Sequence, residues 1–98
     1  MLANLTAQIT TLVAEMDAVG FNLKFDLGGD GVIHVAAKEA PVVVTNTDSD
    51  AETTLRLGAD ILQQLLDKKL NPTTAFMFGK IKIDGDMSNV MSLTSIFS

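Results

Sequence analysis

The sequence predicts a mixed α/β (α+β) fold, with one domain over residues 1–98. Apolar residues recur every three or four positions near the N-terminus and again after residue 60, which is typical of amphipathic helices. Apolar and polar side chains alternate along residues 21–27, which is typical of a half-buried strand. Three strand patterns in succession favour an antiparallel meander, and a helical connection between a fourth and a fifth strand favours a mixed sheet.

The first helix is expected to begin near Leu2 and to stop before Gly20. Its apolar stripe comprises Leu2, Leu5, Ile9, Leu12, Val13 and Met16. A strand over 21–27, a glycine-rich turn over 28–31 and a strand over 32–38 then predict a hairpin. The residues of its second strand that should face the core are Ile33, Val35 and Ala37.

Two more strands and a second helix are expected in the middle of the chain. The valines at 42–44 are β-branched and predict a third strand, and the alternation over 53–57 predicts a fourth. Asp60 has the character of a helix N-cap, with Gln63 as its capping-box partner. This helix should end near Lys69, since basic residues suit the negative pole of the helix dipole.

Asn71 and Pro72 predict a new helix start, with Asn as the N-cap and Pro at the first helical position. Gly79 should end that short helix. The alternation over 80–83 predicts the fifth strand, and a final helix is expected over 85–97.

Composition excludes several classes of function. The chain has no cysteine, so disulfides and thiolate metal sites are excluded. A net charge of -5 argues against general nucleic-acid binding, because such binding neutralises phosphates. No apolar run approaches the ~18 residues of a membrane span. No basic residue precedes Lys24, so no secretory signal is expected and the predicted compartment is the cytoplasm.

Catalysis is not expected either. The single histidine, His34, lies in the middle of a predicted strand and is interpreted as structural or solvent-facing. We recognise no Ser–His–Asp arrangement in the sequence that would serve as a catalytic triad. The acidic run over 48–52 is interpreted as a surface loop, so we predict neither a metal site nor a cofactor.

The last third of the chain, residues 71–97, concentrates adaptable apolar side chains. It holds three of the five Phe and three of the five Met. Phe76, Met77 and Phe78 are consecutive, so a short helix there is expected to bury more than one side. Methionine suits surfaces that adapt to different shapes, although apolar residues at helical spacing are more often plain core. Core packing and a ligand cavity therefore both remain open at this point.

Residues 52–97 resemble the sterol carrier protein 2 family. The resemblance rests on a Thr-rich strand, an acidic helix start at Asp60, LLDKKLNP at 65–72, Ala75-Phe76, and GKIKIDGDM at 79–87. Residues before 52 resemble the family only in architecture, an opening helix followed by a strand meander. The resemblance implies a mixed five-stranded sheet covered on one face by helices, with a hydrophobic tunnel between the sheet and the C-terminal helices.

The family binds fatty acids, fatty acyl-CoA, phospholipids or sterols. By position, the resemblance implies a tunnel lined by Leu65, Leu66, Phe76, Met77, Ile81, Ile83, Met87, Val90, Met91 and Phe97. The clustered lysines are candidate contacts for a lipid headgroup: Lys68, Lys69, Lys80 and Lys82. The sequence ends soon after Phe97, lacks a peroxisomal Ser-Lys-Leu ending and is acidic. These departures predict a short, stand-alone, bacterial-type member and favour a bacterial lipid or an isoprenoid over a sterol.

The sequence therefore predicts a lipid carrier without catalytic activity. Its expected partners are a lipid or fatty acyl ligand and, transiently, a membrane, but no nucleic acid; the oligomeric state stays open. The alternative is a protein-interaction or dimerisation module with the same fold and a filled core. A small isomerase or hydrolase is disfavoured, because no convincing base or oxyanion donor is present.

Overall fold

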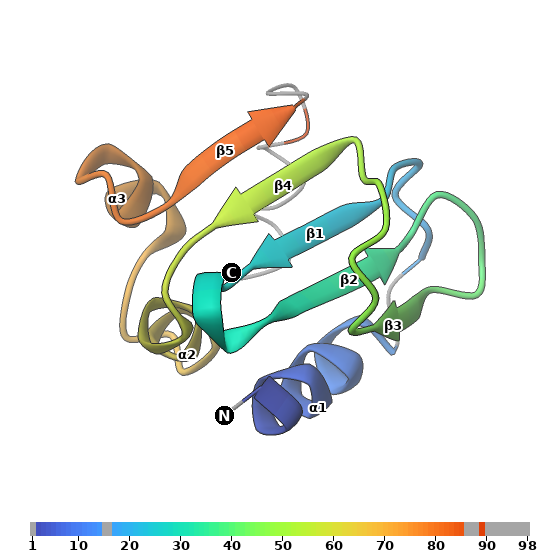
Figure 1. Cartoon of the computed structure of the whole chain (residues 1–98), viewed down its shortest axis with the longest axis horizontal. Coiled ribbons are helices and arrows are strands. Elements are labelled where there is room, and N and C mark those ends of the chain that lie inside the picture. The colour runs from blue at the N-terminus through green and yellow to red at the C-terminus, as the bar shows by residue number, and fades with distance from the viewer. Residues whose placement is uncertain (1, 15–16, 86–88, 90–98) are drawn as a thin grey trace.

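The protein is described by a computed structural model that covers residues 2–14, 17–85 and 89. Its elements in chain order are α1 (Leu2–Val13), β1 (Leu23–Asp26), a 3-10 turn (Gly28–Asp30), β2 (Val32–Ala36), β3 (Val43–Thr45), β4 (Thr53–Arg56), α2 (Ala59–Leu66), α3 (Pro72–Met77) and β5 (Lys82–Gly85). Five strands form one sheet in the order β3-β2-β1-β4-β5 (Figure 1). None of the described helices is long and apolar enough to cross a bilayer.

The sheet is mixed, as predicted, and β1 lies at its centre. β1 pairs with β2 in an antiparallel hairpin, and β2 pairs with β3 in the same sense, so the meander is confirmed. The parallel pair joins β1 to β4, whereas β4 and β5 are antiparallel. The helical connection between β4 and β5 therefore does not create the parallel pairing. Both α2 and α3 lie at the end of the sheet where β4 finishes, so the chain enters β5 from that same end (Figure 1).

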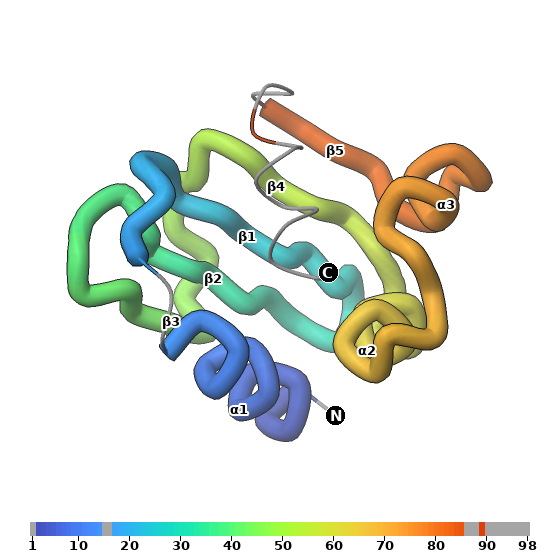
Figure 2. The backbone as a smooth tube through the Cα atoms, turned by 180° about the vertical axis from the view of Figure 1, so that it is seen from behind, coloured from blue at the N-terminus to red at the C-terminus, as the bar shows by residue number. Residues whose placement is uncertain are grey.

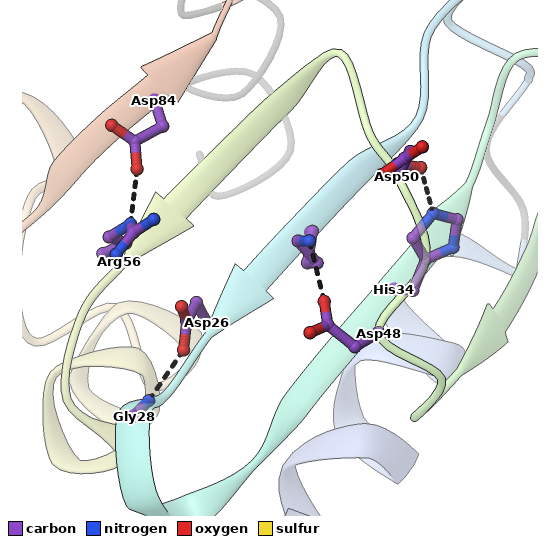
Figure 3. A network of polar contacts seen from close by, with 8 residues as sticks. Asp26, Gly28, His34, Asp48, Asp50, Arg56 and Asp84 are labelled. Atoms are coloured by element: carbon purple, nitrogen blue, oxygen red, sulfur yellow. Dashed lines mark hydrogen bonds and ion pairs between the residues drawn. The ribbon is translucent and has the colours of Figure 1, made fainter.

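The core lies between one face of the sheet and the helices α1 and α2. Successive side chains of a strand point to opposite faces, and the buried side chains of β1 and β2 join those of the two helices in one cluster. Its members are Leu5, Ile9, Val13, Phe21, Leu23, Phe25, Leu27, Ile33, Val35, Ala37, Leu55, Leu57, Ala59, Leu62, Leu65, Ala75 and Ile81. The inward set predicted for the second strand is thus confirmed. The loop over 46–50 crosses the opposite face of the sheet (Figure 3).

A pair of neutral amides joins α1 to α2. Gln8 donates from Nε2 to Oε1 of Gln63 at 3.0 Å, and Gln63 donates back to Gln8 at 3.1 Å. α1 itself ends at Val13, earlier than the predicted stop before Gly20. Met16, which we placed on its apolar stripe, lies outside the described residues.

The start of α3 is confirmed, but the start of α2 differs from the prediction. Asn71 caps α3: its Oδ1 accepts from the backbone N–H groups of Thr73 and Thr74 at 2.8 and 3.2 Å. The N-cap of α2 is Gly58, and Asp60 lies in the first turn. The helix begins earlier because Ala59 packs into the core, and burial outweighs the capping preference of Asp60.

The end of α2 and the start of β5 also differ by a few residues from the predictions, whereas Gly79 follows the C-cap of α3 with a positive φ and ends that helix as predicted. α2 ends at Leu66 rather than near Lys69, because Lys68 adopts a left-handed conformation (φ 60°) and the N–H of Lys69 donates to the carbonyl of Gln64. β5 begins at Lys82 rather than at residue 80, since the N–H of Lys80 still closes the end of α3 on the carbonyl of Ala75. The predicted final helix over 85–97 falls outside the described residues except for Gly85 and Asn89.

Candidate functional site

Two side chains on the polar face of the sheet contact the loop over 46–50. Lys24 on β1 bonds the carboxylate of Asp48 at 2.8 Å, and Nε2 of His34 on β2 lies 3.0 Å from the backbone oxygen of Asp50 (Figure 3). The hydrogen bond from Lys24 lowers the pKa of Asp48. His34 is 6% exposed, so it is buried rather than solvent-facing. Among the described residues, no three acidic or histidine side chains gather as metal ligands do.

Four of the predicted tunnel residues belong to the apolar core cluster or pack against it. Leu65 on α2 and Ile81 before β5 are buried in the core cluster, and Leu66 and Ile83 are partly buried and pack against it. Ile83 lies opposite Leu55 in the β4–β5 ladder, which extends the apolar surface to the edge of the sheet. This part of the molecule, between β4, β5 and α2, is the candidate site.

Two predicted tunnel residues lie apart from that cluster. Phe76 is 40% exposed and Met77 is 78% exposed, and the next residue, Phe78, is 74% exposed. The expectation that the short helix buries more than one side is therefore wrong, since Ala75 is its only buried residue. The remaining predicted lining residues, Met87, Val90, Met91 and Phe97, lie outside the described residues.

Sequence reasoning missed a polar contact at this site. Thr53, the first residue of β4, is fully buried, and its Oγ1 accepts a hydrogen bond from Nδ2 of Asn89 at 2.9 Å. The available signal was a threonine at a strand position whose alternate neighbours, Leu55 and Leu57, are apolar. A hydroxyl at such a position needs a partner in the core.

Sequence reasoning also missed a pocket of about 380 Å³ between α1 and α2. Its lining residues are Ala7, Gln8, Thr11, Leu12 and Leu66. Leu66 therefore borders both this pocket and the core cluster. Leu12, exposed although it belongs to the apolar stripe of α1, was the available signal.

All four candidate headgroup lysines are exposed. Lys68 and Lys69 follow α2, Lys80 follows α3, and Lys82 begins β5 opposite Arg56. Within the described part of the chain none of these lysines forms an ion pair, whereas Arg56 is paired with Asp84 (Figure 3). Their charges are therefore available to an anionic partner.

Residues 3–98 match the SCP-2 sterol transfer family. The chain belongs to this family. Among solved structures, it resembles the sterol carrier protein domain 2 of Helicoverpa armigera, with a TM-score of 0.74 and 26% identity over 97% of this chain and 83% of that one. It also resembles Aedes aegypti sterol carrier protein 2 in complex with palmitate, with a TM-score of 0.73 and 22% identity over 96% of this chain and 91% of that one. The predicted fold and family are thus confirmed.

The curated proteins that this chain resembles are much longer than the chain. Sterol carrier protein 2 of Bos taurus is 39% identical over 54 residues, which are 55% of this chain and 10% of that protein. Human hydroxysteroid dehydrogenase-like protein 2 is 28% identical over 78 residues, which are 80% of this chain and 19% of that protein. The aligned part of the chain thus spans about a tenth to a fifth of the length of these relatives.

Proposed function

We propose that this protein binds a lipid between the apolar face of its sheet and its helices, and carries it without changing it chemically. The observation that supports this function best is that Leu65 and Ile81 belong to the apolar core cluster and that Leu66 and Ile83 pack against it. Membership of a sterol and lipid transfer family supports it independently. We further propose that the predicted lining residues outside the described part of the chain complete the tunnel.

The proposed ligands are a fatty acid, a fatty acyl-CoA, a phospholipid, an isoprenoid or a sterol. Each buried methylene contributes about 0.8 kcal/mol, so a chain of ten gives about 8 kcal/mol, part of which offsets the cost of association. An anionic headgroup would find positive charge at Lys68, Lys69, Lys80 and Lys82. A relative of the same fold was solved with palmitate, which makes a saturated fatty acid the first ligand to test.

Carriage without catalysis agrees with the chemistry of the described residues. His34 is buried and hydrogen-bonded to a backbone carbonyl, so it is poorly placed to act as a general base.

A carrier also has to meet a membrane when it loads and unloads. The cytoplasm remains the expected compartment.

Extraction of the purified protein with organic solvent, followed by mass analysis, tests the proposal. We expect a lipid to be recovered with the protein. A fluorescent fatty acid should bind to the delipidated protein and be recovered unchanged after incubation.

A substitution at Ile83 tests the position of the site. Ile83→Asn should weaken fatty-acid binding at least about tenfold, because it places an amide against the acyl chain. Ile83→Val keeps the surface apolar and should bind within about twofold of the original protein. If Ile83→Asn keeps its circular dichroism spectrum and binds as before, the site is wrongly placed. Met91→Asp applies the same test at a predicted lining residue that lies outside the described part of the chain.

The second candidate function, an interaction or dimerisation module with a filled core, is favoured by the exposure of Met77 and Phe78. Native mass spectrometry separates the two functions. A monomer with a bound lipid supports carriage, and a lipid-free dimer supports the module.

A further inference from the structure

Three consecutive large apolar side chains are exposed where α3 ends. Met77 and Phe78 expose most of their surface, and Phe76 about two fifths. Scattered exposed apolar residues are normal on soluble proteins, but a contiguous group marks a surface that another body covers. We define Phe76, Met77 and Phe78 as the α3 tip.

The charge around the α3 tip is the reverse of that of the whole protein. Residues 68–83 contain four lysines and no acidic residue. The whole chain has a net charge of -5, so the rest of it has -9. The acidic residues that border this segment are Asp67 and Asp84, and Asp84 is already paired with Arg56.

These features lie at one end of the molecule. The connection from α2 to α3, α3 itself and the start of β5 occupy the same end of the sheet in both views (Figures 1 and 2). Lysines therefore precede and follow the α3 tip at that end. This is the composition of a membrane-surface element: apolar side chains enter the acyl boundary, and lysines with long apolar stems reach the phosphates.

We propose that the α3 tip is a docking element for anionic membranes, with Phe78 and Met77 inserted and Lys80 and Lys82 against lipid phosphates. The proposal rests on the carrier function in one respect only, that a carrier must reach a bilayer, and it names the surface that does so. The excess negative charge elsewhere would be repelled by an anionic surface, so electrostatics would orient the protein with this end foremost.

A second copy of the chain is a poorer occupant of this surface. In a two-fold symmetric dimer, residues near the axis face their own counterparts. The lysines around one α3 tip would then face the same lysines of the other copy, and like charges across an interface are costly. An anionic bilayer offers the opposite charge along with an apolar layer.

The insertion of Phe78 can be observed directly, because the chain has no Trp and no Tyr. Phe78→Trp introduces a single fluorophore. With vesicles of equal parts phosphatidylglycerol and phosphatidylcholine, its emission should shift to the blue and be quenched by brominated acyl chains. Val43→Trp is the matched control: Val43 is exposed on β3, the opposite edge strand, and its emission should not change. An unshifted Trp at position 78 in the presence of bound vesicles would overturn the proposal.

Vesicle co-sedimentation measures how much each of these side chains contributes to the affinity for the membrane. Phe78→Ser should weaken binding about tenfold, and Lys80→Gln and Lys82→Gln about fivefold each. The controls Val43→Ser and Lys38→Gln should stay within about twofold. Binding should also disappear in about 1 M salt, where the Debye length is about 3 Å.

Two further results would overturn the docking proposal. One is equal binding to vesicles of phosphatidylcholine alone. The other is a lipid-independent dimer that becomes a monomer in Phe78→Ser, which would assign the α3 tip to protein contact. The carrier function is tested separately from docking. Ile83→Asn should bind the fatty acid at least about tenfold more weakly and still sediment with vesicles. Phe78→Ser should bind the fatty acid as before and sediment with vesicles about tenfold more weakly.

Discussion

Asn89 donates a hydrogen bond from Nδ2 to Oγ1 of Thr53, the first residue of β4, at 2.9 Å. Thr53 lies opposite Leu23 on one side and Gly85 on the other. One buried threonine thus links the central strand β1, the edge strand β5 and Asn89.

Asn89→Ala should destabilise the protein by about 1–2 kcal/mol, because the buried hydroxyl of Thr53 loses a donor. The free energy of unfolding in urea measures this loss. In a double-mutant cycle, Thr53→Val combined with Asn89→Ala should cost less than the sum of the two single changes. Strict additivity would show that the contact contributes nothing to stability.

Gly85→Ala should cost about 2 kcal/mol or more. Gly85 has a φ of +94°, and an added Cβ would collide with the backbone carbonyl oxygen of Glu52. Gly79→Ala is the matched control, since Gly79 also has a positive φ but has open space around its Cβ position. That change should cost only about 1 kcal/mol. Equal urea midpoints for the two variants would contradict the predicted collision.

Asn71→Ala should destabilise the protein by about 1 kcal/mol, because two backbone N–H groups of α3 lose their acceptor. Asn71→Asp keeps an acceptor oxygen and should remain close to the original stability. Thermal unfolding ranks the three proteins. If the alanine and aspartate variants unfold together, the cap does not stabilise α3.

Glu52 should make stability depend on acidic pH. Its carboxylate accepts from the N–H of Asn22 at 2.8 Å and pairs with Lys38, and these contacts hold its pKa below the ordinary value of 4.5. The stability that the ionised Glu52 contributes is therefore present above pH 4.5 and is lost as the pH falls through the lowered pKa of Glu52.

Comparison with Glu52→Gln isolates this contribution. From about pH 6 down to about pH 3, the stability advantage of the original protein over Glu52→Gln should shrink, because protonation makes Glu52 neutral, as Gln already is. Glu39→Gln is the control, as Glu39 is exposed and makes no ion pair with a described residue. A constant difference between the original protein and Glu52→Gln across this range would refute the assignment.

Local patterns were sufficient to predict the hairpin and the start of α3. Alternation determined which residues of β2 face the core, and Asn71-Pro72 set the helix start through a side-chain cap and a fixed φ. The start of α2 was less predictable, because the burial of Ala59 overrode the capping preference of Asp60. Secondary-structure boundaries that depend on tertiary packing have no local signature.

The candidate site was predicted only in part. Leu65 and Ile81 are buried in the core and Ile83 packs against it, because hydrophobic spacing places them on inward faces; their role as tunnel lining stays a prediction. The exposure of Phe76 and Met77 was not predictable from their apolar character, since α3 has only six residues and buries Ala75 alone. The contact between Thr53 and Asn89 joins residues 36 positions apart, and no local pattern specifies such a pair.

The parallel pairing of β1 with β4 has a consequence for how the sheet assembles. Partners in this ladder are thirty positions apart, as Leu23 and Thr53 are, whereas the β1–β2 hairpin closes over a 3-10 turn. The entropy of closing a longer loop must be met before its contacts stabilise the chain. We therefore expect β4 and β5 to join a hairpin that has already formed. The side of the sheet formed by β4 and β5, where the lipid is proposed to bind, is then the last to be buried. Refolding in the presence of a fatty acid is the condition under which this late burial should be observed.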